Sequence, residues 1–256
     1  MDLIKYVRMP EPLTVFGIMY IIYAVFHIIS YLKDGYWDGI FPEIKYFIKM
    51  RFKYIFIFIL VVIFIVVFID KPISNLCRTL YNVNVYTVTD FVSHMGEGWF
   101  LGASLFTLAV ILNFLKRDND AIAFQIAFMT SILAGLINAV LKFVFNRERP
   151  VIGNDQWHFF HFFLTSGKNP DNLMYAYNSM PSGHTISVVS ALTVLFCYSQ
   201  NKLLRYLLVF FGCLIAYARV YTLNHWPSDV FASAVMGILI GRISYNLNKK
   251  RFSLTN

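Results

Sequence analysis

Three short runs of polar residues in this chain have side chains suited to binding and cleaving a phosphate. They are Lys142 with Arg149-Pro150, then Pro181-Ser182-Gly183-His184, then Arg219 with His225 and Asp229. Together they supply three fixed cations, a turn with backbone donors, two histidines and a carboxylate. Each run lies at or beside the end of a long apolar segment, where charged side chains are costly, so together they predict a functional site.

The first run pairs two cations of different geometry. Arg149 follows Lys142 by seven residues, which is about two helical turns. Pro150 disfavours helix at the preceding residue, so we expect the chain to leave the helix at Arg149. Arginine offers a planar fork to two phosphate oxygens, and lysine a compact point charge. The alternative is that Lys142, Arg147 and Arg149 only extend to lipid headgroups.

The second run predicts a turn that opens an apolar helix. Ser182 is expected to be the N-cap of that helix, and Gly183 allows the backbone to approach a ligand closely. Backbone amides at a helix start, together with the helix dipole, form an anion site. His184 would then lie in the first turn beside the anion. The alternative is a simple capped helix start.

The third run places a nucleophile beside a carboxylate. Arg219 lies near the end of an apolar segment, where an unpaired guanidinium would be expensive. Pro227 suits the first position of the following helix. Asp229, four residues after His225, can accept the ring N–H, which fixes the tautomer and favours the charged imidazole. The other ring nitrogen is then free to attack. The alternative is a histidine at the membrane edge and an aspartate that caps a helix.

In this order, the Lys-x6-Arg-Pro, Pro-Ser-Gly-His and Arg-x5-His-x3-Asp runs resemble the type 2 phosphatidic acid phosphatase (PAP2) superfamily. The same pattern occurs in vanadium haloperoxidases and bacterial acid phosphatases, but the hydropathy of this chain excludes such soluble relatives. The resemblance covers roughly residues 54–247. The third motif of the family usually begins Ser-Arg, and Ala218 replaces that serine here, which removes one possible hydroxyl contact to phosphate.

The resemblance implies a role for each residue of the three runs. His225 would be the nucleophile that forms a phosphohistidine, activated by Asp229, and His184 the general acid that protonates the leaving oxygen. The phosphate would be held by Lys142, Arg149, Arg219, Ser182 and the Gly183 amide. Such preorganised donors are commonly the largest catalytic term, and two covalent steps let water complete the hydrolysis. Because the cations do what Mg²⁺ does elsewhere, we expect no metal and no cofactor.

Composition places these runs in a membrane protein. Of the 256 residues, 58% are hydrophobic and 14% charged, against about 25% charged in soluble domains. The net charge of +8 comes from residues in short loops between apolar runs, which is the positive-inside arrangement, so we expect no nucleic-acid partner. The three cysteines show no disulfide or metal-ligand spacing.

A membrane helix needs about 20 apolar residues, which yields seven candidate spans. They are Leu13–Leu32, Tyr54–Ile69, Gly98–Leu115, Ala121–Phe145, Thr185–Ser199, Leu204–Thr222 and Asp229–Leu247. The predicted fold is an all-α polytopic membrane bundle, with a six-helix PAP2-like core and one extra N-terminal transmembrane helix. Residues 1–53 would form this anchor and a cytoplasmic connection, residues 54–247 the catalytic core, and residues 248–256 a cytoplasmic basic tail.

The basic residues of the connections set the expected orientation. The cytoplasmic connections would hold Lys45, Lys49, Arg51, Lys53, Lys116, Arg117, Lys202, Arg205, Lys249, Lys250 and Arg251. All three polar runs then emerge on the opposite face, so we expect a multi-pass protein of the cytoplasmic membrane with its active site on the periplasmic or extracellular side. For the first span an outside N-terminus is slightly favoured, and we interpret this span as a retained anchor, not a signal peptide.

Three further segments carry smaller predictions. The aromatic run 157–163 is interpreted as an interfacial belt, or alternatively as a wall of a lipid entry groove. The polar run from Asp90 to Gly98 is interpreted as a helix-entry loop with capping residues. Gly237 and Gly241 form a Gly-x3-Gly pair that predicts close helix packing, within the monomer more than between chains.

The predicted function is a metal-independent membrane phosphatase that cleaves a phosphomonoester or pyrophosphate on a lipid headgroup. Candidate substrates are undecaprenyl pyrophosphate, phosphatidylglycerol phosphate, phosphatidic acid and lipid A phosphates. A lipid phosphotransferase would use the same phosphohistidine with an alcohol as acceptor. A transporter or a non-enzymatic lipid-binding protein is the alternative from another class, but charges gathered at one face argue against transport. The expected partners are the substrate and the bilayer, and no obligate protein partner is evident.

Overall fold

The computed structural model describes residues 40–160, 176–249 and 251, with side chains from residue 53 onward. The predicted first span, Leu13–Leu32, lies outside the described residues, as do positions 161–163 of the aromatic run and most of the basic tail. The helices are α2 (Ile40–Phe68), α3 (Asp70–Thr79), α4 (Val83–His94), α5 (Gly98–Phe114), α6 (Asp118–Phe145), α8 (Gly183–Tyr198), α9 (Lys202–Tyr221) and α10 (Pro227–Asn248). No strand occurs in these described ranges, and the all-α prediction is confirmed.

In the described part of the chain, three helices are long and apolar enough to cross a membrane, or up to five if each bent pair counts as one span. Helices α6, α9 and α10 are each long and apolar enough to cross alone. Two pairs reach this length together: Lys53–Phe68 with α3, bent by 44°, and α4 with α5, bent by 55°. Helix α8 is apolar but has only 16 residues. The predicted polytopic membrane bundle is therefore confirmed, with two of its spans broken at the same end.

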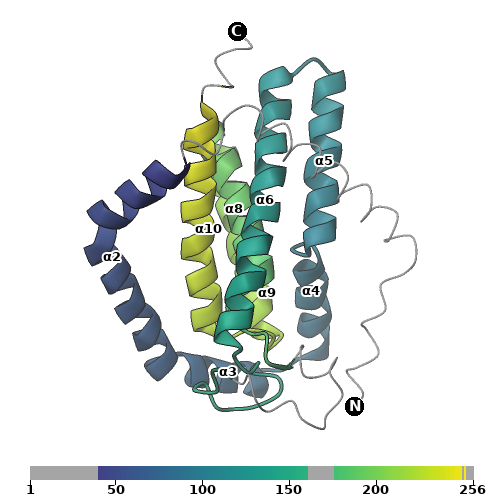
Figure 1. Ribbon diagram of the computed structural model, residues 1–256. Coiled ribbons are helices and arrows are strands. Elements are labelled where there is room, and N and C mark those ends of the chain that lie inside the picture. The colour runs from purple at the N-terminus through teal and green to yellow at the C-terminus, as the bar shows by residue number, and fades with distance from the viewer. Residues whose placement is uncertain (1–39, 161–175, 250, 252–256) are drawn as a thin grey trace.

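Helix α8 lies at the centre of the bundle, between α6, α9 and α10 (Figure 1). Its packing on α10 is close because α10 presents glycines to it. A Cβ at Gly237 would lie 3.0 Å from the Ile186 carbonyl oxygen, and one at Gly241 would lie 2.6 Å from Thr193 Cβ. The predicted role of the glycine pair in packing within the monomer is confirmed.

Helix α6 ends close to the predicted site. Asp118 and Asp120 lie in the first turn of α6, where acidic side chains favour the helix dipole. The helix ends at Phe145, and Asn146 adopts a left-handed conformation with φ 37° and ψ 56°, which asparagine tolerates better than most residues. The chain thus leaves the helix before Arg149, and the prediction that it does so at Arg149 is wrong by four residues.

The segment between the second and third predicted spans is mostly helical. Helix α3 lies across the end of the bundle where α6 ends and α10 begins, and α4 rises from it toward α5 (Figure 1). The prediction of a loop with capping residues over Asp90 to Gly98 is wrong. The chain stays helical through His94, and Glu97 precedes α5 without a side-chain cap bond. Its carboxylate instead accepts hydrogen bonds from the His94 ring, at 2.6 Å, and from Trp99 Nε1.

Candidate active site

The first and second polar runs meet where the end of α6 faces the start of α8. A Cβ at Gly183 would lie 3.0 Å from Asn138 Nδ2 and 4.0 Å from Lys142 Nζ. The bare Gly183 backbone therefore lies next to the Lys142 ammonium and the Asn138 amide. Any side chain at position 183 would occupy space between this ammonium and the backbone at the start of α8.

Ser182 is the N-cap residue of α8, but its side chain does not cap the helix. Its hydroxyl shares a hydrogen bond of 2.9 Å with Thr185 Oγ1, and its backbone N–H donates to Ser233 Oγ at 2.7 Å. The position is as predicted, whereas the expected capping bond is absent. Ser182 is fully buried, and its bond to Ser233 ties the second run to α10.

His225 is held by a backbone carbonyl that the sequence did not indicate. Its Nδ1 donates to the Ser179 carbonyl at 2.6 Å, and Asp229 Oδ2 lies 3.8 Å from the same nitrogen. The prediction that Asp229 directly accepts this ring N–H is therefore wrong, because the chain before Pro181 passes closer to the ring than the carboxylate does. The chemical result is unchanged: Nδ1 carries the hydrogen, and the lone pair of the neutral ring is on Nε2.

Asp229 lies behind His225, on the Nδ1 side of the ring, and both of its carboxylate oxygens accept hydrogen bonds. Oδ1 accepts from Arg147 Nη1 at 2.5 Å, and Oδ2 accepts from the Ser179 hydroxyl at 2.5 Å and the Trp226 N–H at 2.9 Å. Ser179 thus touches both groups, the ring through its carbonyl and the carboxylate through its hydroxyl. Pro227 is the first residue of α10, as predicted. Because Asp229 Oδ2 accepts the Trp226 N–H, Asp229 also caps the start of that helix.

Arg147 is a site residue that sequence analysis missed. It was grouped with cations that extend to headgroups, but its side chain is fully buried. It donates to Asp70 Oδ2 and Ser228 Oγ, both at 2.7 Å, and its guanidinium lies 4.5 Å from the centroid of the Phe159 ring. The headgroup interpretation is wrong for Arg147. A third basic residue between Lys142 and Pro150 was the only available signal, and spacing alone could not separate it from its neighbours.

Arg149 and Arg219 are also buried, each 7% exposed, so the headgroup interpretation of Arg149 is wrong as well. Arg149 Nη1 donates to Asn224 Oδ1 at 3.1 Å, which ties the loop after α6 to the turn after α9. Arg219 Nη1 donates to Ser93 Oγ at 2.5 Å. Ser93 lies near the end of α4, in the segment that had been interpreted as a loop, so its role was not predicted.

The three cations of the first and third runs act on the two histidines. Arg219, Lys142 and Arg149 all act electrostatically on both His184 and His225. Burial lowers the pKa of His225 well below its usual range, while the Asp229 carboxylate opposes this and the three cations reinforce it. Asp229 does favour the charged imidazole, as expected, but burial is the larger effect and the net pKa is lowered. The ring is neutral at neutral pH and can act as a nucleophile.

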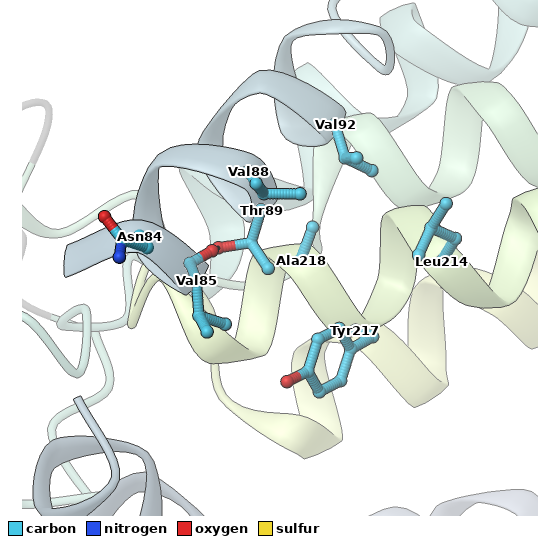
Figure 2. A pocket seen from close by; sticks show the side chains of 8 residues that line it. All are labelled: Asn84, Val85, Val88, Thr89, Val92, Leu214, Tyr217 and Ala218. Atoms are coloured by element: carbon cyan, nitrogen blue, oxygen red, sulfur yellow. The ribbon is translucent and has the colours of Figure 1, made fainter. Parts of the chain in front are cut away.

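The break between α4 and α5 lies beside these groups. A Cβ at Gly96 would lie 3.3 Å from His184 Cβ. An apolar hollow of about 400 Å³ lies between α4 and α9 (Figure 2). It is lined by Asn84, Val85, Val88, Thr89, Val92, Leu214, Tyr217 and Ala218. Ala218, which replaces the serine of the third motif, is part of this apolar lining and directly precedes Arg219 in the chain.

Comparison with known families agrees with this arrangement. The family model described as the PAP2 superfamily matches residues 123–253, just over half of the chain. The chain belongs to the PAP2 superfamily. In this PAP2 protein the matched region begins inside α6 and includes every residue of the three runs, whereas Asp70 and Ser93 precede it. Among the described residues, no cluster of His, Cys, Asp and Glu could hold a metal.

Two curated relatives of this PAP2 protein are undecaprenyl-diphosphatases. BcrC of Bacillus subtilis (strain 168) is 27% identical over 121 residues, covering 47% of this chain and 55% of the relative. The protein of Sulfolobus acidocaldarius is 29% identical over 143 residues, covering 54% and 60%. The matches span less than two thirds of both relatives.

Two solved structures share the PAP2 fold. Aquifex aeolicus LpxE superimposes with a TM-score of 0.52 at 23% identity, covering 69% of this chain and 94% of that chain. The transmembrane PAP2-type phosphatidylglycerolphosphate phosphatase of Bacillus subtilis gives a TM-score of 0.55 at 16% identity, covering 77% and 94%. The fold is therefore that of membrane PAP2 proteins.

Proposed function

We propose that this PAP2 protein is a membrane lipid phosphatase that cleaves a headgroup phosphomonoester or pyrophosphate through a phosphohistidine on His225. One observation carries the proposal. The buried His225 ring donates from Nδ1 to the Ser179 carbonyl at 2.6 Å, which leaves Nε2 as its nucleophilic atom. The charges of Lys142, Arg149 and Arg219 act on the same ring.

The reaction proceeds in two balanced steps. His225 Nε2 attacks phosphorus, the bond from phosphorus to the leaving oxygen breaks, and His184 gives that oxygen a proton. Water then attacks the phosphohistidine, the phosphorus–nitrogen bond breaks, and His184 takes a proton from the water. Inorganic phosphate leaves, and both histidines return to their starting states. Splitting the transfer into two steps lowers the barrier of each.

The surrounding charges match what each step requires. Lys142, Arg149 and Arg219 would bind the phosphate oxygens and stabilise negative charge as it develops. The ring of His225 becomes positively charged when Nε2 bonds to phosphorus. Asp229 Oδ2, 3.8 Å from Nδ1, would stabilise that charge, and in a buried site such an interaction is stronger than in water.

The membrane fold and the relatives support a lipid substrate. Both curated relatives are named undecaprenyl-diphosphatases, which favours a polyprenyl pyrophosphate as the first substrate to test. Phosphatidylglycerol phosphate, phosphatidic acid and lipid A phosphates are the other candidates. We also propose that the protein resides in the cytoplasmic membrane with this site on the non-cytoplasmic side, because the basic connections would face the cytoplasm.

The test is phosphate release by the purified full-length chain from each of the four lipids, with EDTA and without an added alcohol acceptor. We expect release from at least one lipid, abolished in His225→Ala and retained in His94→Ala. His94 is a matched control because its side chain is 57% exposed and pairs with Asp90 and Glu97. Wild-type activity in His225→Ala would refute the nucleophile assignment. If the wild type releases no phosphate in this assay but transfers phosphate to an alcohol added in a parallel reaction, the protein is a phosphotransferase.

A further inference from the structure

Asp70 is a fully buried carboxylate that the proposed reaction does not use. It is the first residue of α3, in a part of the chain that the family model does not match. Asp70 Oδ2 pairs with Arg147 Nη2 at 2.7 Å and accepts the Ser228 hydroxyl at 2.5 Å. Asp70 Oδ1 accepts the Ser228 backbone N–H at 2.8 Å. Losing one partner of such a buried ion pair would leave an uncompensated buried charge, which is strongly destabilising.

Arg147 extends this contact to the nucleophile. While one terminal nitrogen binds Asp70, the other donates to Asp229 Oδ1 at 2.5 Å and to Ser228 Oγ at 2.7 Å. The chain of charges is therefore Asp70, Arg147, Asp229, and all three side chains are fully buried. Two carboxylates share one guanidinium, so the group carries one net negative charge directly behind His225.

That net charge depends on Asp70. If Asp70 were neutral, Arg147 would balance Asp229 alone, and no net negative charge would remain behind the ring. The other groups that act on His225 are Arg219 from α9, Arg149 after α6, Lys142 from α6 and His184 from α8. None of these supplies negative charge. The positive charge that forms on His225 during transfer would then face the cations, and Arg147 would cancel the charge of the one remaining carboxylate, Asp229.

Asp70 also fixes geometry at the start of α10. It holds both the N–H and the hydroxyl of Ser228, the residue immediately before Asp229. Orientation of Asp229 thus depends on α3, which lies across this end of the bundle (Figure 1).

We propose that Asp70 is a positioning residue for phosphoryl transfer: through Arg147 and Ser228 it fixes the Asp229 carboxylate and keeps a net negative charge behind His225. This inference rests on the proposed function, and it adds a contribution from α3 to the chemistry of the three runs.

Asp70→Asn in the full-length protein tests the charge while keeping the shape of the side chain. We expect kcat to fall at least about tenfold, since a tenfold change in rate corresponds to about 1.4 kcal/mol, with KM changed less than about twofold. The acidic limb of the kcat/KM profile should move to lower pH, because loss of a nearby negative charge makes an imidazole harder to protonate.

Two further variants separate the charge from general structural effects. Ser228→Ala removes the hydroxyl that links Asp70 and Arg147 but keeps all three charges, so kcat should fall by a smaller factor and the acidic limb should stay in place. Asp118→Asn removes an exposed acid at the first turn of α6. Its kcat and the position of its acidic limb should match those of the wild type. Thermal unfolding in detergent reports whether each variant is folded.

Wild-type kcat and an unchanged pH profile in folded Asp70→Asn would overturn the inference. If Asp70→Asn does not fold, Ser228→Ala decides: a loss in kcat without a change in KM supports the positioning role, and wild-type kcat overturns it. The proposed function fails separately, since in that case the wild-type protein itself would release no phosphate from any of the lipids.

Discussion

His225 shows how the surroundings of a single residue set its chemistry. The ring is 1% exposed and donates through Nδ1 to a backbone carbonyl. A carbonyl can only accept, so this contact selects the tautomer with its lone pair on Nε2. Burial keeps the ring neutral. Asp229 Oδ2 lies 3.8 Å from Nδ1, where it would stabilise the positive charge that the ring gains during the proposed transfer. The proposed nucleophile is thus oriented before a substrate binds.

The lowered pKa of His225 predicts how stability varies with pH. The unfolded chain has the ordinary histidine pKa of about 6.5 and the folded chain a lower one, so between these values the unfolded state binds more protons. The free energy of unfolding should therefore decrease as the pH falls below about 6.5. Thermal unfolding in detergent between pH 5 and pH 8 checks this.

His225→Gln is the variant that isolates the contribution of His225, because glutamine does not titrate in this range. We expect a shallower loss of stability at low pH in His225→Gln than in the wild type. Exposed His94 provides the control, and His94→Ala should follow the wild-type curve. Equal pH dependence in His225→Gln and the wild type would contradict the assignment.

At the scale of helices, the site depends on how closely α8 and α10 pack. The second run opens α8, the third opens α10, and their backbones approach where α10 has glycines. Ser233 of α10 accepts the Ser182 N–H at 2.7 Å, which links the two helix starts directly. A shift of α10 away from α8 would therefore alter the phosphate site as well as the packing.

Gly241→Ala tests this packing. The new Cβ would lie 2.6 Å from Thr193 Cβ, closer than real Cβ atoms approach, so the helices must separate. We expect a loss of about 1–3 kcal/mol, the usual cost of overpacking, seen as a lower unfolding temperature in detergent.

Gly212→Ala in α9 is the matched control. Its Cβ would lie 3.6 Å from Leu192 Cδ1, which is an ordinary van der Waals contact, so the unfolding temperature should change little. If both variants unfolded at the wild-type temperature, the close contact of α8 and α10 would not limit stability.

At the scale of the whole molecule, the chain separates its basic connections from its candidate active site. The turn between α5 and α6 and the end of α10 lie at one end of the bundle, and α3 with the start of α10 lies at the other (Figure 1). Tyr198 at the end of α8 binds Asp120 at the start of α6, at 2.8 Å, so α8 also runs between these two ends. By the positive-inside rule, this separation supports the proposed placement of the active-site end on the non-cytoplasmic side.

Thiol labelling in intact cells tests this orientation. In a background with Cys77, Cys197 and Cys213 replaced by serine, Asn84→Cys and Asp118→Cys would each place one exposed thiol at opposite ends of the bundle. A membrane-impermeant maleimide should label Asn84→Cys in intact cells and Asp118→Cys only after permeabilisation. The reverse pattern would place the site in the cytoplasm.

The sequence by itself determined the membrane class, the spans and the residues of the three runs. Hydrophobic length and charge in the connections are local properties, and the motif residues are recognisable by type and spacing. These features predicted the positions of α5, α6, α8, α9 and α10 within a few residues. They also led to the PAP2 family, which the family model confirms.

Only the tertiary structure decided which groups orient the proposed nucleophile, His225. The Ser179 carbonyl contacts His225, Arg147 contacts Asp229, and Asp70 contacts Arg147, each from a distant part of the chain. A backbone carbonyl has no sequence signature. In the sequence, a buried arginine between two carboxylates cannot be distinguished from an arginine that faces lipid headgroups. Contacts over such separations arise from the packing of α3, the α6 exit and α10 against each other, which no local spacing encodes.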